Sequence, residues 1–217
     1  MALRKISFST GEYYHIYNRG NNKQKIFHDN QDKERLVALL YACNQDQAFK
    51  IFNLSKGQSL YDISIDNNII AVGAYCLMSN HFHILVKEIK ERGITTFMKK
   101  VMTGYVMYYN KKYNKTGGLF EGKFKAEHVA SDQYLKYLFA YIHLNPVKVI
   151  DPNWKIVGLK NFNKTKNYLI NYAHSSLSFY LRVERVENKV INKTYFPDYF
   201  PTTKSVWKDL NIWLHFS

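Results

Sequence analysis

The chain has 217 residues and carries 31 Lys and Arg against 17 Asp and Glu, a formal net charge of +14. Its length suits one domain with an appendage, and no apolar run is long enough for a transmembrane helix or forms the core of a signal peptide, so we expect a cytoplasmic protein. Such a basic chain predicts a polyanionic partner, and nucleic acid is favoured over a membrane because no isolated basic amphipathic helix is found.

The first third of the chain predicts a strand, a helix and an irregular segment. Residues 12–18 alternate and are rich in aromatic rings, which is typical of a strand. Apolar residues then recur at helical spacing after Asp29 or Asn30, either of which can cap the helix. Residues 48–68 contain two short strand-like pieces, FKIF and YDISI.

The strongest strand signals cover residues 69–77 and 81–87, which we expect to form an antiparallel hairpin. Alternate residues of a strand point to one face, so His81 and His83 face one side and Phe82 the other. Two imidazoles on one strand face can bind one metal ion. They can equally be polar residues on a solvated face.

Two helices and a strand follow. Residues 95–113 predict a helix, and residues 124–130 a strand. Residues 132–144 predict a second helix, capped by Ser131. Pro146 is expected to end it, because the residue before a proline is disfavoured in the helical region.

The resulting order, β-α-β-β-α-β-α, predicts an α+β fold of the ferredoxin-like, split βαβ type, with helices packed on an antiparallel sheet. Residues 1–150 are expected to form the main domain. Residues 151–217 are expected to form a folded C-terminal extension that packs on or beside it and contacts the nucleic acid. Trp207 and Trp213 of the extension are interpreted as packing anchors rather than as rings that stack on bases.

Tyr141 and Asn145 lie four residues apart, and so share one face of the last core helix. In a split βαβ fold this helix packs on the sheet and can bring both side chains beside His81 and His83. Two imidazoles and one amide oxygen suit Mn²⁺ and tolerate Mg²⁺, and a tyrosine hydroxyl near a metal-bound phosphodiester is a nucleophile. The alternative is that Tyr141 is a core aromatic residue and Asn145 a helix cap.

Five segments together resemble a known family. They are YHIYNRGNNKQKIF (14–27), AYCLMSNHFHILV (74–86), GGLFEGKFKAEHV (117–129), YLKYLFAYIHLNPVK (134–148) and YAHSSLSFY (172–180). In content, order and spacing they resemble the HUH family of single-tyrosine DNA nucleases, and specifically the IS200-like, REP-associated tyrosine transposases. The resemblance extends from about residue 12 to about residue 181.

The resemblance implies that residues 1–150 are the catalytic domain of a transposase. His81, His83 and Asn145 would hold a divalent metal, Mg²⁺ or Mn²⁺. Tyr141 would attack a phosphodiester of single-stranded hairpin DNA, leaving a 5′-phosphotyrosine link and a free 3′ hydroxyl. We expect a monomer, with a homodimer as the alternative.

Three features depart from the family pattern. Ser79 replaces the proline that usually precedes the Asn-His pair. Lys148, Val149 and Ile150 stand where the family usually has Arg-Ala-Gly. Residues 48–68 are interpreted as an insertion that touches DNA or only lengthens an edge.

Basic residues beside the motifs are the predicted DNA contacts: Arg19, Lys111, Lys112, Lys115, Lys123 and Lys125. For Arg19 a surface ion pair is an equal alternative. Tyr105 and Tyr109, which interleave with the lysines, are expected in the core. His15 is interpreted as a core histidine or one that contacts a metal ligand, and neither His128 nor His143 is assigned a role.

Three other functions compete with the transposase. A non-catalytic RNA-binding module of the same fold has no use for His81, His83 and Tyr141, and no RNP1 pattern is present. A replication-initiator or relaxase nuclease also fits a single tyrosine, but the YIHLNPV context favours the transposase. A domesticated protein that keeps the site without mobility is not distinguished by the sequence.

Overall fold

The computed structural model describes residues 6–47 and 58–215. These residues form four strands, β1 (Tyr13–Arg19), β2 (Ile70–Leu77), β3 (His81–Glu88) and β4 (Lys125–His128). The α-helices are α1 (Asn30–Ala42), α2 (Gly93–Tyr113), α3 (Asp132–Leu144), α4 (Val147–Ile150), α5 (Trp154–Val157), α6 (Phe162–Ile170), α7 (Leu177–Tyr180) and α8 (Thr203–His215). Short 3-10 helices are η1 (Asn21–Lys23), η3 (Leu60–Asp62), η4 (Val186–Val190) and η5 (Lys193–Tyr195). Within the described ranges, no helix is long and apolar enough to cross a membrane.

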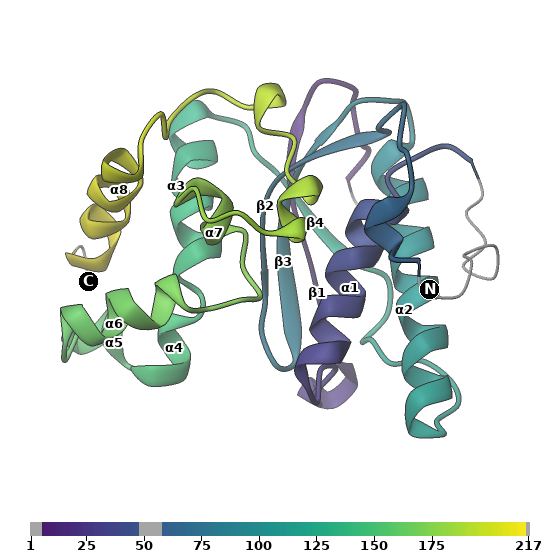
Figure 1. The fold of residues 1–217 in the computed structure, drawn as a ribbon, viewed down its shortest axis with the longest axis horizontal. Helices are drawn as coiled ribbons and strands as arrows, with labels where there is room; N and C mark the ends of the chain where they lie inside the picture. Colours follow the sequence, from purple (N-terminus) through teal and green to yellow (C-terminus); the bar gives the residue numbers. More distant parts are fainter. Residues whose placement is uncertain (1–5, 48–57, 216–217) are drawn as a thin grey trace.

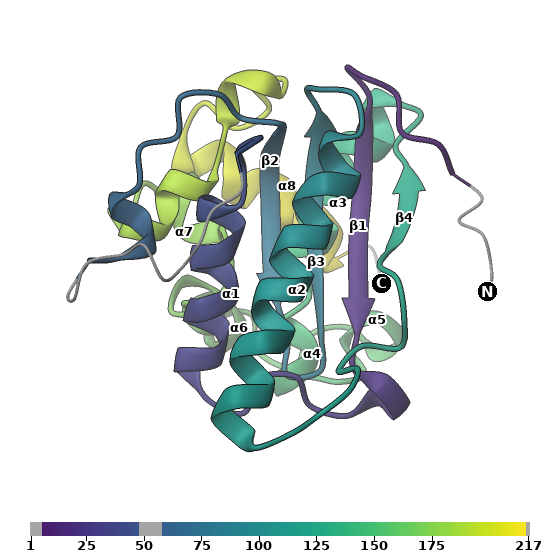
Figure 2. The same cartoon turned by 90° about the vertical axis from the view of Figure 1, so that its right-hand side faces the viewer.

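The four strands pair antiparallel in the order β2-β3-β1-β4. This sheet order, with the β-α-β-β-α-β sequence of elements, confirms the predicted split βαβ fold class. Helices α1 and α2 cover one face of the sheet, whereas α3 covers the other and α4 to α8 lie around α3 (Figure 1). A perpendicular view shows α1 and α2 side by side in front of the strands (Figure 2).

Strand β3 contributes to a separate core on each face of the sheet. Phe82, Ile84 and Val86 pack beneath α1 and α2. Leu85 belongs to the second core, which includes much of α3. Because side chains alternate along a strand, His81 and His83 share the α3 face with Leu85, as the sequence predicted.

Both predicted helix caps are confirmed. The Asp29 carboxylate accepts a hydrogen bond from the Asp32 amide at 2.9 Å, and the Ser131 hydroxyl accepts one from the Tyr134 amide at 3.2 Å. The Ser131 cap fixes where α3 begins, and so it also fixes the helical face on which Tyr141 lies.

One expectation about an irregular segment was wrong. YDISI (61–65) is not a strand, because residues 60–62 form η3, capped by the Ser59 side chain; FKIF lies outside the described residues. The end of helix α3 at Leu144 is confirmed, but the residue before Pro146 does not leave the helical region, because Asn145 has φ −52° and ψ −40°. The chain continues through Pro146 directly into α4, since a proline is tolerated where a helix begins.

The C-terminal extension covers the outer edge of β2, which would otherwise present unpaired backbone groups. Three backbone hydrogen bonds join β2 to the extension: Leu77 N to His174 O at 3.0 Å, Ser176 N to Tyr75 O at 3.0 Å and Asn192 N to Val72 O at 2.9 Å. The extension also shares the core around α3. Whether residue 150 is a true domain boundary stays a prediction.

Gly73 allows the extension to approach the sheet closely. A Cβ atom at this position would lie 2.7 Å from the Phe196 ring. The Gly73 carbonyl also accepts a hydrogen bond of 2.6 Å from the Tyr180 hydroxyl. A larger residue would therefore push the extension off β2.

Helix α3 is anchored to this edge through His143. The His143 ring is fully buried beneath the extension, and its Nε2 lies 2.8 Å from the Ser176 hydroxyl oxygen. Burial lowers the pKa of His143 to about 3, so the folded protein keeps this imidazole neutral.

We expect the free energy of unfolding of His143→Gln to depend less on pH than that of the wild type. Below the ordinary histidine pKa of 6.5 the unfolded chain binds a proton at His143, whereas the folded chain does so only near pH 3. The contribution of His143 to the free energy of unfolding is therefore fully present above about pH 7 and is lost as the pH falls from there toward 3. Urea unfolding at about pH 7.5 and about pH 5 measures the difference. Identical pH dependence in both proteins would contradict it.

Candidate functional site

The structure brings together four of the residues that the sequence singled out for chemistry. His81 and His83 come from β3, and Tyr141 comes from α3. The His83 ring lies 5.1 Å from that of His81 and 5.5 Å from that of Tyr141, in edge-to-face contact. Asn145 follows α3 by one residue, and its side-chain amide donates a 2.8 Å hydrogen bond to the Tyr141 carbonyl.

A chain of polar contacts across the sheet orients His83. Its Nδ1 lies 2.8 Å from Nε2 of His15, which is buried on β1 as predicted. The other nitrogen of His15 lies 3.8 Å from the Glu127 carboxylate of β4. Glu127 also accepts a 2.8 Å hydrogen bond from the Tyr17 hydroxyl. With these partners on its Nδ1 side, His83 directs Nε2 away from the sheet contacts.

His81, like His83, is oriented by a polar partner at its Nδ1 atom. Its Nδ1 lies 2.7 Å from the side-chain oxygen of Asn80, the residue before it. In the described part of the chain, neither His81 Nε2 nor His83 Nε2 has a hydrogen-bond partner. Because the side-chain nitrogen of Asn145 is hydrogen-bonded to the Tyr141 carbonyl, the side-chain oxygen is the atom left to bind an external group. Two imidazole nitrogens and one amide oxygen are thus available to a cation.

Both imidazoles are held neutral, the form in which histidine binds a metal. Burial, with the nearby charges of Lys148 and Arg19, lowers the pKa of His81 to about 4. Burial, with His15, His81 and Lys148, lowers the pKa of His83 to about 2. Over residues 6–47 and 58–215, no cluster of three His, Cys, Asp or Glu side chains is arranged for a metal ion, so a site here requires the amide of Asn145.

Tyr141 is half-buried, and its hydroxyl is a poor nucleophile on its own. Burial and the neighbouring Tyr137 raise its pKa, while a hydrogen bond from Asn145 acts in the opposite direction. The Lys155 ammonium lies 5.3 Å from the centre of the Tyr141 ring. Activation at neutral pH therefore requires additional positive charge near the phenol oxygen.

Two cavities adjoin these residues. One, of about 330 Å³, is lined by Tyr17, Asn18, Arg19, Lys23, Asn80, His81, Phe82, His83 and Lys125. The other, of about 210 Å³, is lined by Tyr137, Tyr141, Leu144, Asn145, Lys148, Trp154, Lys155 and Trp213. The first contains the histidine pair and the second contains Tyr141 and Asn145, and the ring contact of His83 with Tyr141 joins the two sets of residues.

The predicted DNA-binding residues are distributed unequally around this site. Arg19 and Lys125 line the cavity at His81, and Arg19 pairs with Glu121 at 2.6 Å, the alternative foreseen for it. Lys111, Lys115 and Lys123 are exposed. The end of β1, the start of β3 and the C-terminal end of α2 lie at one end of the molecule (Figure 2).

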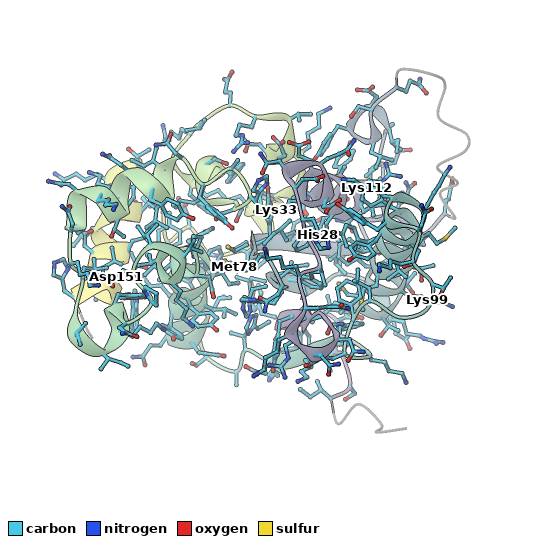
Figure 3. All side chains as sticks on the ribbon, turned by 90° about the horizontal axis from the view of Figure 1, so that it is seen from below. His28, Lys33, Met78, Lys99, Lys112 and Asp151 are labelled. Atoms are coloured by element: carbon cyan, nitrogen blue, oxygen red, sulfur yellow. The ribbon has the colours of Figure 1, made fainter. Side chains whose placement is uncertain are left out.

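Lys112 has internal partners. Its ammonium lies 2.8 Å from carboxylate oxygens of both Asp29 and Asp32, the second of which is completely buried. Seen from below, Lys112 and His28 lie to one side of Met78 and Asp151 lies to the other (Figure 3). Its role as a DNA contact stays a prediction, although its charge is already compensated within the protein.

Sequence reasoning did not assign Asn80, Glu127, Lys148 or Lys155 to the site. Asn80 directly precedes His81, so its position in the matched SNHFH segment was an available signal. Glu127 faces the site only through the pairing of β4 with β1, opposite His15. Lys155 belongs to the extension, and no periodicity in the sequence placed it beside Tyr141.

The comparisons with known proteins concern the family and the fold. A family model described as "Transposase IS200 like" matches residues 9–145. A solved structure described as a REP-associated tyrosine transposase bound to a REP hairpin has a TM-score of 0.55 at 10% identity, covering 86% of this chain and 90% of that one. The tRNA(His) guanylyltransferase of Saccharomyces cerevisiae covers 90% of this chain and 85% of that one, at 11% identity and a TM-score of 0.34, too low to support a conclusion. A search of the curated proteins found no match.

Proposed function

Because the chain belongs to the family of IS200-like transposases, we propose that it cuts and rejoins single-stranded DNA through Tyr141. The observation that carries this proposal is the meeting of Tyr141 on α3 with the histidine pair on β3, with the Tyr141 and His83 rings 5.5 Å apart. The four residues meet without a residue from a second copy, and we propose a monomer as the active form.

The proposed substrate is single-stranded DNA that carries a hairpin. The solved transposase of similar fold is described as bound to a REP hairpin. In this chain, Arg19, Lys23 and Lys125 line the cavity beside His81, and the two lysines are proposed to contact phosphates on one side of the cleaved bond, together with Arg19 once it exchanges Glu121 for a phosphate. Lys111, Lys115 and Lys123 are proposed to contact the backbone farther along.

In the proposed reaction, the Tyr141 oxygen forms a bond to the phosphorus of one phosphodiester while the bond from phosphorus to the 3′ oxygen breaks. The phenol loses its proton, the 3′ oxygen leaves as a hydroxyl, and the 5′ phosphate stays on Tyr141. Attack by another 3′ hydroxyl reverses the step and joins two strands. No energy-supplying cofactor is required, because the phosphotyrosine conserves the energy of the broken bond.

His81 Nε2, His83 Nε2 and the Asn145 amide oxygen would hold Mg²⁺ or Mn²⁺. When bound, the ion would polarise the phosphate and supply the positive charge that the Tyr141 hydroxyl lacks. The protein's own contribution is to keep both imidazoles neutral and oriented through His15 and Asn80. Asn145 also ties this ligand set to the backbone of the proposed nucleophile.

Tyr141→Phe is expected to abolish a covalent protein–DNA adduct. The substrate is labelled single-stranded hairpin DNA from the flanks of this gene, incubated with Mn²⁺ or Mg²⁺ and run on a denaturing gel. Tyr195→Phe is the matched control, because Tyr195 is exposed and lines neither of the two cavities at the site. If the adduct still forms in Tyr141→Phe, another tyrosine is the nucleophile. Tight DNA binding without any adduct would favour a non-catalytic DNA-binding protein.

His15→Phe is expected to weaken Mn²⁺ binding by roughly 10- to 100-fold, the usual cost of removing a residue that orients a metal ligand. Phenylalanine keeps a ring in the buried space but removes the nitrogen that contacts His83 Nδ1. Isothermal titration with Mn²⁺ measures the affinity without DNA or catalysis. The control is His128→Gln, an exposed histidine on β4. Equal affinity in His15→Phe and the wild type would show that this contact does not orient a metal ligand.

A further inference from the structure

The C-terminal extension completes a small cavity directly beside Tyr141 and Asn145. Trp154 and Lys155 of α5 and Trp213 of α8 line it together with Tyr137 of α3. All three extension residues lie outside the span 9–145 that the family model matches. The wall that the extension contributes to this cavity therefore lies outside what the family model describes, whereas Tyr137, Tyr141, Leu144 and Asn145 lie inside it.

The cavity concentrates positive charge without compensation. Lys148 and Lys155 both line it, and none of its lining residues is acidic. Among the described residues, neither lysine forms an ion pair. Partial burial and the nearby charge of Lys148 lower the pKa of Lys155, which is consistent with two cations held close together. An anion entering the cavity would relieve this repulsion.

Aromatic rings form the other part of the wall. The Tyr137 and Trp213 rings lie 4.6 Å apart and inclined at 61°, and Tyr141 follows 5.9 Å from Tyr137. Lys155 lies 5.4 Å from the centre of the Trp154 ring. Aromatic rings beside lysines are the combination that binds single-stranded nucleic acid, through base stacking and phosphate contact. A volume of about 210 Å³ is below the roughly 300 Å³ at which sites for drug-sized ligands begin, so it suits one base.

We propose that this cavity binds one base of the single-stranded DNA, that of the nucleotide on the 3′ side of the cleaved bond. The inference rests on the proposed function, since it uses the polarity of attack by Tyr141. The tyrosine retains the 5′ phosphate of that nucleotide and itself lines the cavity. In an in-line displacement the 3′ hydroxyl leaves on the side opposite the tyrosine oxygen, so the preceding nucleotide lies toward Arg19 and Lys125.

The proposal changes the interpretation of Trp213. From the sequence, Trp207 and Trp213 were both expected to be packing anchors. Both do pack against the core around α3. Trp207, however, is absent from the cavity lining and instead lies beneath the Lys166 ammonium, 5.1 Å away. The two tryptophans of α8 are therefore a matched pair, one at the cavity and one outside it.

The test compares binding of a labelled single-stranded hairpin oligonucleotide from the gene flanks, measured by fluorescence anisotropy in EDTA so that no cleavage occurs. We expect Trp213→Ala to weaken binding about fivefold or more, the effect of removing one stacking ring. Trp213→Phe should keep most of the affinity, and Trp207→Ala should bind like the wild type. Lys155→Gln should weaken binding and lower its salt dependence, whereas Lys166→Gln should do neither.

A scan with single abasic sites then locates the base. One position should weaken binding to the wild type but not to Trp213→Ala, because the stacking partner is already lost. Where the adduct maps the cleaved bond, that position should be the first nucleotide on its 3′ side. Equal behaviour of the two tryptophan variants, or no abasic position that depends on Trp213, would overturn the pocket.

The same oligonucleotides incubated with Mn²⁺ separate this inference from the proposed function. An adduct that forms while Trp213→Ala and Trp207→Ala bind alike would leave the nuclease intact and refute the base pocket. Trp213-dependent binding with no adduct would support the pocket and refute the nuclease. An abasic effect on the 5′ side of the cleaved bond would refute the proposed polarity.

Discussion

Burying a polar ring without a partner is unfavourable, and this constraint organises the sheet around His83. Only 7% of His83 is exposed, so its Nδ1 needs a hydrogen-bonding neighbour. Strand β1 supplies His15, and β4 supplies Glu127 for the far side of His15. Three strands are thus joined by polar side chains on the same face that carries apolar residues such as Leu85. The imidazole that results is neutral, fixed in orientation and free at Nε2.

Much of this arrangement follows from local patterns in the sequence. The alternation in HFHILV assigns His81 and His83 to one face, and side-chain caps at Asp29 and Ser131 locate two helices to within a residue. The pairing of His15 with His83 does not follow, because strand register depends on contacts 68 residues apart. The end of α3 at Leu144 follows from the sequence, but the continuation of the chain through Pro146 into α4 does not. A proline restricts its predecessor only on average, and here Asn145 and Pro146 join two consecutive helices.

The extension was the part least predictable from sequence, and it is also the part that holds α3 in place. Its backbone pairs with the edge of β2, and Ser176 contacts both Tyr75 and His143. The contact of Ser176 with Tyr75 joins residues 101 positions apart and that with His143 joins residues 33 positions apart, and no sequence periodicity predicts either. Gly73 is a similar case, because the need for glycine at this position arises from the Phe196 ring that packs against it, and the sequence does not show that contact. The position of the proposed nucleophile thus depends on the extension as well as on the core that carries the histidine pair.

The covered edge of β2 has a consequence for biosynthesis. A nascent chain that has reached about residue 150 already contains the histidine pair, Tyr141 and Asn145, yet the edge of its most buried strand is still open. Until residues 172–192 emerge from the ribosome, that edge can pair with another chain instead of its own continuation. Completion of the last quarter of the chain is then the event that both protects the protein from association and sets α3 against the sheet. A product truncated near residue 150 would carry every proposed catalytic group and leave the β2 edge open to pairing with another chain.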